Sequence, residues 1–426
     1  MGPIVSGVRE DASQSERDGR SGGDVGVEAV GMGEVRRYIG VAERRARLAL
    51  RQRLAGDARA AGPEEVAESM VALHGSDPAT VFLAVGARLA DPGRTVAETE
   101  RALYEDRTLV RMHGMRHTVF VFPTELTPVV HSSTSLAVAA KERASLLKHM
   151  EVGGAPDAAW LKEVEESTLA ALARRGQATA VELAEDEPRL RRRFLYGAGK
   201  SYEGLHTVST RLLKVLGAEG KVVRARPLGS WTSSQYRWAV APPHPEWDVA
   251  EAQAALLGRW LAVCGPATEA DLKWWTGWRV SDVRRALAAI GARAVGLDEG
   301  TGYVVAGDEE PVVGPGESWA ALLPGLDPTA MGWQQRDWYL PAELRPSLFD
   351  YSGNIGPTVW WNGRVVGGWA QRADGEVVWR LLDAKGVGRE GEVAIASEVE
   401  RLRGWLGGAR VTPRFRSPLE RELAGS

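Results

Sequence analysis

The sequence predicts an α+β protein in which three tandem winged helix-turn-helix units precede a small β-rich C-terminal domain. Three observations carry this prediction. The length of 426 residues allows two or three structural units. Three segments repeat one order of signals: a helix, a short second helix, a third amphipathic helix and a strand pair closed by turn residues. Beyond Gly314 the order changes to short strands broken by glycine and proline.

The predicted domain boundaries follow from these segments. Residues 1–30 are rich in glycine, serine and charge and contain no apolar run, so we expect a disordered tail there. The other predicted domains are the first winged helix at 31–125, a linker helix with the second winged helix at 126–245, the third winged helix at 246–310, and the β-rich domain with a terminal helix at 311–426.

Each unit is predicted from its periodicity. The helical patterns of the first two units cover 35–54, 63–73, 77–89, 161–176, 180–186 and 206–220. Their strand patterns cover 115–123, 221–228 and 235–241. Thr179 is expected to cap the helix that follows it, and Gly229-Ser230 marks the turn of the second wing.

The third unit gives the clearest pattern, with helices at 250–265, 266–277 and 279–291 and a strand pair at 292–307. In the C-terminal domain, Asn362-Gly363 is typical of a hairpin turn, and a final amphipathic helix covers 390–407. We expect this domain to pack on the third wing.

The composition excludes several classes of protein. No stretch of about 18 apolar residues is present, so no membrane span is expected. The single cysteine, Cys264, cannot form an internal disulfide, and the seven histidines lack the spacing of a zinc site. We therefore expect a cytoplasmic protein without a zinc site. We also expect a monomer.

The net charge of -3 does not favour nucleic-acid binding by the whole surface. Tandem winged helices can nevertheless line one DNA-binding face with arginines while the opposite face is acidic. The candidate DNA-binding residues are Arg111, Arg116, Arg193, Lys200, Arg211, Ser230, Ser233 and Arg284. The serines belong to a second wing that would probe a DNA groove. The alternative is that any one of these arginines is only a solvated surface residue.

Two further motifs point to structure rather than chemistry. The GAGKS run at Gly197–Ser201 is not a nucleotide-binding loop, because Phe194 stands where the motif requires its first glycine. Trp274, Trp275 and Trp278 could stack on bases, but tryptophans at helical spacing more often belong to a core.

The segment Leu73–Thr80 contains the candidate catalytic residues His74, Ser76 and Asp77. Asp77 before Pro78 is a typical helix start, with an aspartate N-cap and proline at the first helical position. Capping explains Ser76 and Asp77 without any chemistry, but it does not require His74. A histidine beside a hydroxyl and a carboxylate can position water as a general base.

Four motifs make the chain resemble the AlkZ/YcaQ-like winged-helix DNA glycosylases from about Val35 to Arg416. They are LVRMHGMRHTVFVFP (Leu109–Pro123), GPATEADLKWWTG (Gly265–Gly277), LLPGLDPTAMGW (Leu322–Trp333) and PTVWWNGRVVGGW (Pro357–Trp369). The resemblance implies excision of N-alkylated purines or unhooking of crosslinks, in some members as self-resistance of antibiotic producers, without a metal or cofactor. It also implies a catalytic motif of glutamine, any residue, then glutamine or aspartate in this loop.

This sequence departs from that motif, because His74 stands at the first position and Ser76 at the second. The family's carboxamides are thought to hold a water and to stabilise the cationic sugar as the N-glycosidic bond breaks. His74 with Ser76 can hold the water, provided that His74 is neutral and does not repel the cation. Arg111 and Arg116 would contact the DNA backbone nearby.

The sequence therefore predicts a monofunctional DNA glycosylase that acts on alkylated or bulky purine nucleotides in duplex DNA. A non-catalytic DNA-binding protein, either a regulator or a lesion sensor, is the first alternative. A protein-interaction scaffold built from winged helices is the second.

Overall fold

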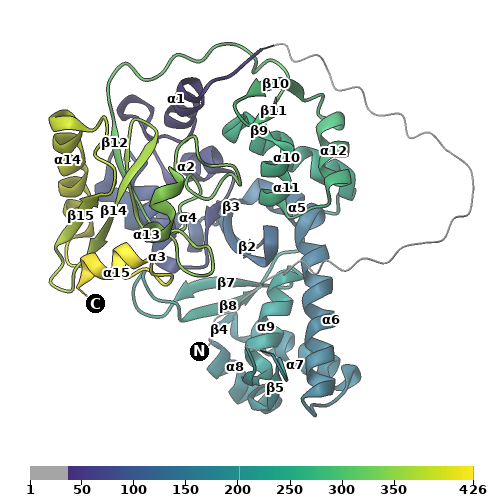
Figure 1. The fold of residues 1–426 in the computed structure, drawn as a ribbon. Coiled ribbons are helices and arrows are strands. Elements are labelled where there is room, and N and C mark those ends of the chain that lie inside the picture. The colour runs from purple at the N-terminus through teal and green to yellow at the C-terminus, as the bar shows by residue number, and fades with distance from the viewer. Residues whose placement is uncertain (1–36, 201, 426) are drawn as a thin grey trace, which may run out of the picture.

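The computed structural model describes residues 37–200 and 202–425 as a mixed assembly of helices and strands (Figure 1). The disordered tail predicted at residues 1–30 lies outside the described residues. No helix within the described ranges is long and apolar enough to cross a membrane.

Three segments share the element order helix, strand, helix, helix, strand, strand. In each segment the last strand pairs with both other strands and lies between them. The first segment consists of α2 (Pro63–Met70), β1 (Leu73–His74), α3 (Pro78–Gly86), α4 (Thr95–Tyr104), β2 (Leu109–His113) and β3 (Val119–Pro123). The second consists of α7 (Ala158–Arg175), β4 (Gln177–Ala178), α8 (Ala180–Asp186), α9 (Val208–Ala218), β7 (Val222–Pro227) and β8 (Tyr236–Val240). The third consists of α10 (Val249–Cys264), β9 (Ala267–Thr268), α11 (Glu269–Thr276), α12 (Val280–Ala289), β10 (Arg293–Leu297) and β11 (Gly300–Val304).

The first segment departs most from the predicted elements. The helix predicted at 35–54 is α1 (Val41–Arg51), which precedes the segment, and α4 was not predicted. The buried face of α4 is formed by Thr95, Thr99, Ala102 and Leu103, so half of it is polar and gives no apolar periodicity. The strand predicted from Met115 begins at Val119, because Arg116 and His117 adopt left-handed backbone conformations in a turn.

The second segment contains an insertion. The hairpin of β5 (Arg193–Tyr196) and β6 (Gly204–Thr207) separates α8 from α9 and was not predicted as strands. The long helix α6 (Leu136–Val152) leads into this segment, which extends away from the other two and has its own apolar core (Figure 1). The Thr179 side chain caps α8 as predicted, in a capping box with Glu182.

The C-terminal region forms an antiparallel sheet in the order β12 (Ala320–Leu323), β13 (Thr358–Trp361), β14 (Arg364–Gln371) and β15 (Val377–Leu381). The hairpin predicted at Asn362-Gly363 joins β13 to β14, with both residues at positive φ. Helix α14 (Gly388–Leu406) covers β12, and α15 (Pro418–Ala424) covers β14.

The C-terminal region packs on the first segment as well as on the third, and the packing on the first segment was not predicted. The buried side chains of β10 and β11 cluster with Ile39, whereas the C-terminal sheet shares an apolar core with the first segment. Helix α3 explains why the C-terminal sheet packs on the first segment. All nine residues of α3 are buried, so the helix must be covered on several sides.

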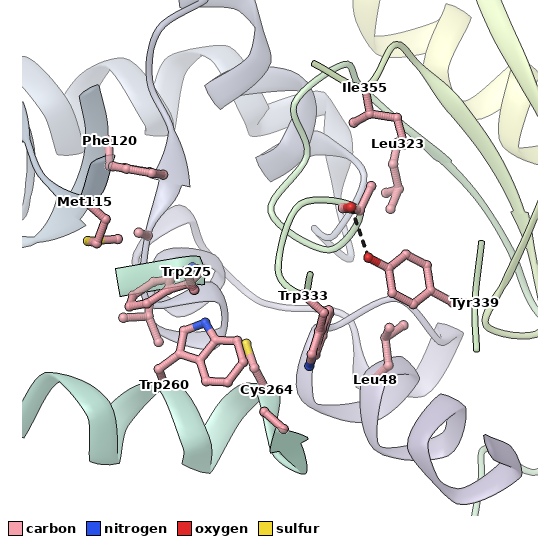
Figure 2. Close-up of a cluster of buried hydrophobic side chains, with 14 of the residues drawn as sticks. Leu48, Met115, Phe120, Trp260, Cys264, Trp275, Leu323, Trp333, Tyr339 and Ile355 are labelled. Atoms are coloured by element: carbon pink, nitrogen blue, oxygen red, sulfur yellow. Dashed lines mark hydrogen bonds between the residues drawn. The ribbon is translucent and has the colours of Figure 1, made fainter. Parts of the chain in front are cut away.

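A second core joins the first segment, the third segment and the C-terminal region (Figure 2). Trp260, Trp333 and Tyr339 lie at its centre, with ring centroids 5.9 Å and 5.8 Å apart in successive pairs. Trp275 and Trp278 belong to this core, as their helical spacing indicates. Trp274 is only partly buried and is the exception.

Candidate functional site

The loop Gly75–Asp77 joins β1 to α3 and passes tightly across β3. His74 pairs with Phe120, and the Gly75 N–H donates to the Val119 carbonyl at 2.8 Å. A Cβ on Gly75 would lie 3.2 Å from both the Val119 oxygen and the Arg111 guanidinium. The close approach therefore favours glycine and fixes His74 at the end of the strand.

Asp77 acts as a structural residue. Its Oδ1 accepts the Ala79 N–H at 3.1 Å as the predicted N-cap of α3, and its Oδ2 accepts the Arg414 N–H at 2.8 Å. Burial raises the pKa of this carboxyl, although the two hydrogen bonds oppose the shift. Both oxygens are engaged with backbone N–H groups, which does not favour the predicted role of Asp77 as an orienting partner of His74; that role stays a prediction.

His74 is neutral in this environment. Burial first, and then the charges of Arg116 and Arg111, lower the pKa of His74 to about 3. Its Nδ1 lies 3.5 Å from the Ser76 N–H, and its ring meets Phe120 edge-on. A general base needs a pKa near the working pH, so this lowered pKa does not favour general-base action, and the catalytic role of His74 stays a prediction. A neutral imidazole can still hold a water by hydrogen bonding.

Arg111 lies beneath the loop rather than on the surface. It is 3% exposed, and its Nη1 donates to the Gly75 carbonyl at 2.6 Å. This burial limits access to Arg111, and its predicted contact with the DNA backbone stays a prediction. The residue fixes the backbone between His74 and Ser76.

Arg116 connects the loop to the third segment. Its guanidinium lies 4.0 Å from the ring centroid of Trp274, and that of Arg336 lies 5.1 Å from the same centroid. Burial and the neighbouring charge of Arg336 lower the pKa of Arg116 to about 10. Arg116 therefore remains charged at neutral pH and close enough to act on His74.

Five arginines around the loop lack a carboxylate partner for their side chains among residues 37–200 and 202–425. We call this set the arginine row, and its members are Arg111, Arg116, Arg224, Arg336 and Arg414. Most other arginines in the described ranges form ion pairs with carboxylates, as Arg88 does with Asp327. Two members of the row, Arg116 and Arg111, act electrostatically on His74.

The other predicted DNA-binding residues lie apart from the row. Arg193 and Lys200 are exposed on the inserted hairpin, and Arg211 lies 3.6 Å from the ring centroid of Tyr196. Arg284 is exposed but bound to Glu269 at 2.6 Å, so its expected free charge is already compensated. The sequence spacing did not reveal this acid on α11, and the DNA-binding role of Arg284 stays a prediction.

The second wing is anchored rather than free. Trp231, between Ser230 and Ser233, is buried against Phe82 of α3 with ring centroids 5.0 Å apart, and its ring lies 6.1 Å from that of Trp405. Ser230 is exposed, while Trp231 anchors the wing to α3. The wing thus forms a contact between the second and first segments, and the DNA-binding role of Ser230 and Ser233 stays a prediction.

Sequence reasoning missed Arg224, Arg336, Arg414 and Tyr236. Arg224 and Tyr236 lay on correctly predicted strands, but the sequence does not show which strand residues have partners. Arg336 and Arg414 lie in loops and carry no periodic signal. The turn Gly197–Lys200 joins two strands and precedes no helix, in agreement with the rejection of a nucleotide-binding loop.

The described residues hold no group of three or more histidine, cysteine, aspartate or glutamate side chains that could bind a metal ion. Cys264 is buried, and this burial raises its pKa to about 12.

Comparisons with known proteins agree with this fold. The family model described as DNA glycosylase AlkZ-like matches residues 67–405. The structure is similar to that of the Streptomyces sahachiroi DNA glycosylase AlkZ, with a TM-score of 0.67 and 20% sequence identity. The similarity covers 86% of this chain and 97% of that chain. No curated protein matches the sequence.

Proposed function

The chain belongs to the AlkZ-like DNA glycosylase family, as its motifs indicate, and we propose that it hydrolyses the N-glycosidic bond of alkylated purine nucleotides in duplex DNA. The observation that carries the proposal is the environment of His74, a neutral imidazole on a fixed loop among arginines that lack acidic partners. Purines alkylated at N7 or N3, or carrying bulky adducts, are the substrates that this chemistry favours.

A neutral His74 suits a cationic leaving group. An alkylated purine already carries positive charge, so the bond breaks through an oxocarbenium-like state without prior protonation of the base. An imidazolium would repel that developing cation, whereas a neutral ring does not. His74 and Ser76 would hold the attacking water by hydrogen bonds, and little proton abstraction is needed once the sugar is cationic.

The three repeated segments support the DNA-binding part of the proposal. We interpret each as a winged helix-turn-helix unit because the element order and the strand order are those of that motif. The arginine row supplies positive charge where the first, second and third segments approach one another. Such a concentration binds a phosphate backbone even though the whole chain is slightly acidic.

One observation favours a second candidate, a DNA-binding protein without catalysis. The loop departs from the family motif at His74 and Ser76, and Asp77 is fully used in structural hydrogen bonds. In this interpretation the loop is only a helix cap within a regulator or lesion sensor.

Release of abasic sites separates the two candidates. Purified protein is incubated with a duplex that contains one N7-methylguanine, and strand cleavage at abasic sites is measured after mild alkali. A glycosylase produces breaks at the lesion in proportion to time, and an unmodified duplex serves as the control. Tight binding without breaks on any N7- or N3-alkylated duplex would establish the second candidate.

A further inference from the structure

Three members of the arginine row meet beside Ser76, although they come from different parts of the chain. The guanidinium groups of Arg111 on β2 and Arg224 on β7 each lie 5.1 Å from the ring centroid of Tyr236. Arg414, from the loop before α15, donates from Nη1 to the Ser76 carbonyl at 3.3 Å. The first segment, the second segment and the C-terminal loop thus each contribute one cation to one place.

Among the described residues no carboxylate forms an ion pair with the side chain of Arg111, Arg224 or Arg414, although the buried Asp77 carboxylate interacts electrostatically with Arg111 and Arg414. The nearest carboxylate at the loop is Asp77, whose oxygens accept the N–H groups of Ala79 and Arg414. By contrast, Arg226, two residues after Arg224 on the same strand, is bound by Glu100 at 2.6 Å and Glu105 at 2.8 Å. Of these two arginines on one strand, Arg226 is therefore paired with acids and Arg224 is not.

The same place holds donors without partners. Arg111 Nε, Arg111 Nη2 and the Tyr236 hydroxyl are buried and make no hydrogen bond to the described residues. Buried donors of this kind are rare, because leaving them unpaired is unfavourable. Burial and the charges of Arg111 and Arg414 also lower the pKa of Arg224 to about 10, so Arg224 stays charged at neutral pH. An anion would relieve both the repulsion and the missing hydrogen bonds.

We propose that Arg224, Arg414 and Tyr236 form a binding site for one phosphate group of the DNA strand, next to the nucleotide held at His74. The proposal rests on the proposed DNA-directed function. A guanidinium presents a planar pair of donors that matches two phosphate oxygens, and the exposed Arg414 leaves the site open to solvent. The phosphate also acts on the loop, because Arg111 and Arg414 donate to the Gly75 and Ser76 carbonyls.

The first experiment measures the salt dependence of binding to an unmodified fluorescent duplex. Arg224→Met keeps an apolar side chain against Tyr236 and removes the charge, and Arg226→Met is the matched control. Loss of one phosphate contact should reduce the slope of log K against log salt concentration by about 0.9 in Arg224→Met. The slope of Arg226→Met should equal that of the wild type, because its charge is already compensated.

The second experiment locates the contact. Single phosphates are replaced in turn by uncharged methylphosphonates around an N7-methylguanine. At one position the replacement should weaken wild-type binding by roughly tenfold and leave binding by Arg224→Met unchanged. The proposal is overturned if the Arg224→Met slope equals the wild-type slope, or if every replacement affects both proteins alike.

These outcomes are distinguishable from failure of the proposed glycosylase activity, because the measurements do not require base release. Binding with the expected slope change but without excision refutes the enzyme and leaves the phosphate site in place. Excision by the wild type, together with an Arg224→Met salt slope equal to that of the wild type, supports the enzyme and refutes the phosphate site. No binding by the wild type overturns both. The melting temperature of Arg224→Met should equal or exceed the wild-type value, because the substitution removes an unpaired buried charge, so misfolding would be detected directly.

Discussion

The carboxylate of Asp77 accepts the backbone N–H of Arg414 at 2.8 Å, across 337 positions of sequence. The residue that starts α3 thus also holds the last loop of the chain beside His74. At the other end of α3, Arg88 donates to both oxygens of Asp327 at 2.9 Å and 2.7 Å. The C-terminal region therefore holds the helix behind the candidate site at both ends.

Removal of Asp77 should destabilise the protein whether or not it is an enzyme. Asp77→Ala removes the N-cap of α3 and leaves the Arg414 N–H without its acceptor, for a loss of roughly 2 kcal/mol in the free energy of unfolding. Chemical denaturation measures this loss. Asp91→Ala, which removes the cap of an exposed turn, is the control and should have a smaller effect. Equal losses in the two variants would contradict a special role for the link to Arg414.

The Arg88–Asp327 pair should be among the most sensitive positions of the fold. Both side chains are fully buried, and all the Arg88 donors are engaged. Asp327→Ala leaves a buried guanidinium without its counter-charge, so we expect a loss of about 3–5 kcal/mol or failure to fold. Glu400→Ala breaks the exposed pair with Arg403 and should cost about 1 kcal/mol or less. Expression level and denaturation midpoint measure both effects.

The sequence predicts the third segment and the C-terminal hairpin closely, because apolar periodicity and glycine turns determine them locally. It does not predict α4, whose buried face includes Thr95 and Thr99, or the anchoring of the second wing through Trp231. The loop around His74 is found from local capping signals alone. The arginines around this loop cannot be found from local signals. Whether Arg224 or Arg226 has an acidic partner depends on α4, which is distant in sequence.

Arg116 should contribute to DNA binding without sequence preference. Its charge is uncompensated and lies between the loop and Trp274, so Arg116→Ala should weaken binding to every duplex alike and reduce the salt slope by about 1. Arg284→Ala, whose charge Glu269 already balances, is the control and should leave the slope unchanged. Fluorescence anisotropy on several unrelated duplexes tests the prediction, and a loss confined to one sequence would indicate base readout instead.

The pH dependence of base release should lack an acidic limb near the ordinary pKa of histidine. Because the pKa of His74 in the folded protein is about 3, the ring stays neutral as the pH falls through 6.5. The unfolded chain binds protons first in that range, so stability, unlike activity per folded molecule, should decrease from about pH 6.5 toward pH 3. His113 and His131, with pKa values lowered to about 3 and about 4, add to the same trend. Single-turnover rates at pH 5 and pH 8, with circular dichroism as a check of folding, test both parts.

The substitution that best tests the catalytic role is the one that returns His74 to the family's residue. If the neutral imidazole only holds water, His74→Gln keeps hydrogen-bonding groups near the same place and should retain activity within about tenfold, whereas His74→Ala should lower it by roughly 100-fold. Neither variant should change DNA affinity, because the neutral ring contributes no charge to the arginine row. Single-turnover release of N7-methylguanine measures the rates. Wild-type activity in His74→Ala would refute the role, and loss in His74→Gln equal to that in His74→Ala would show that the imidazole does more than hold water.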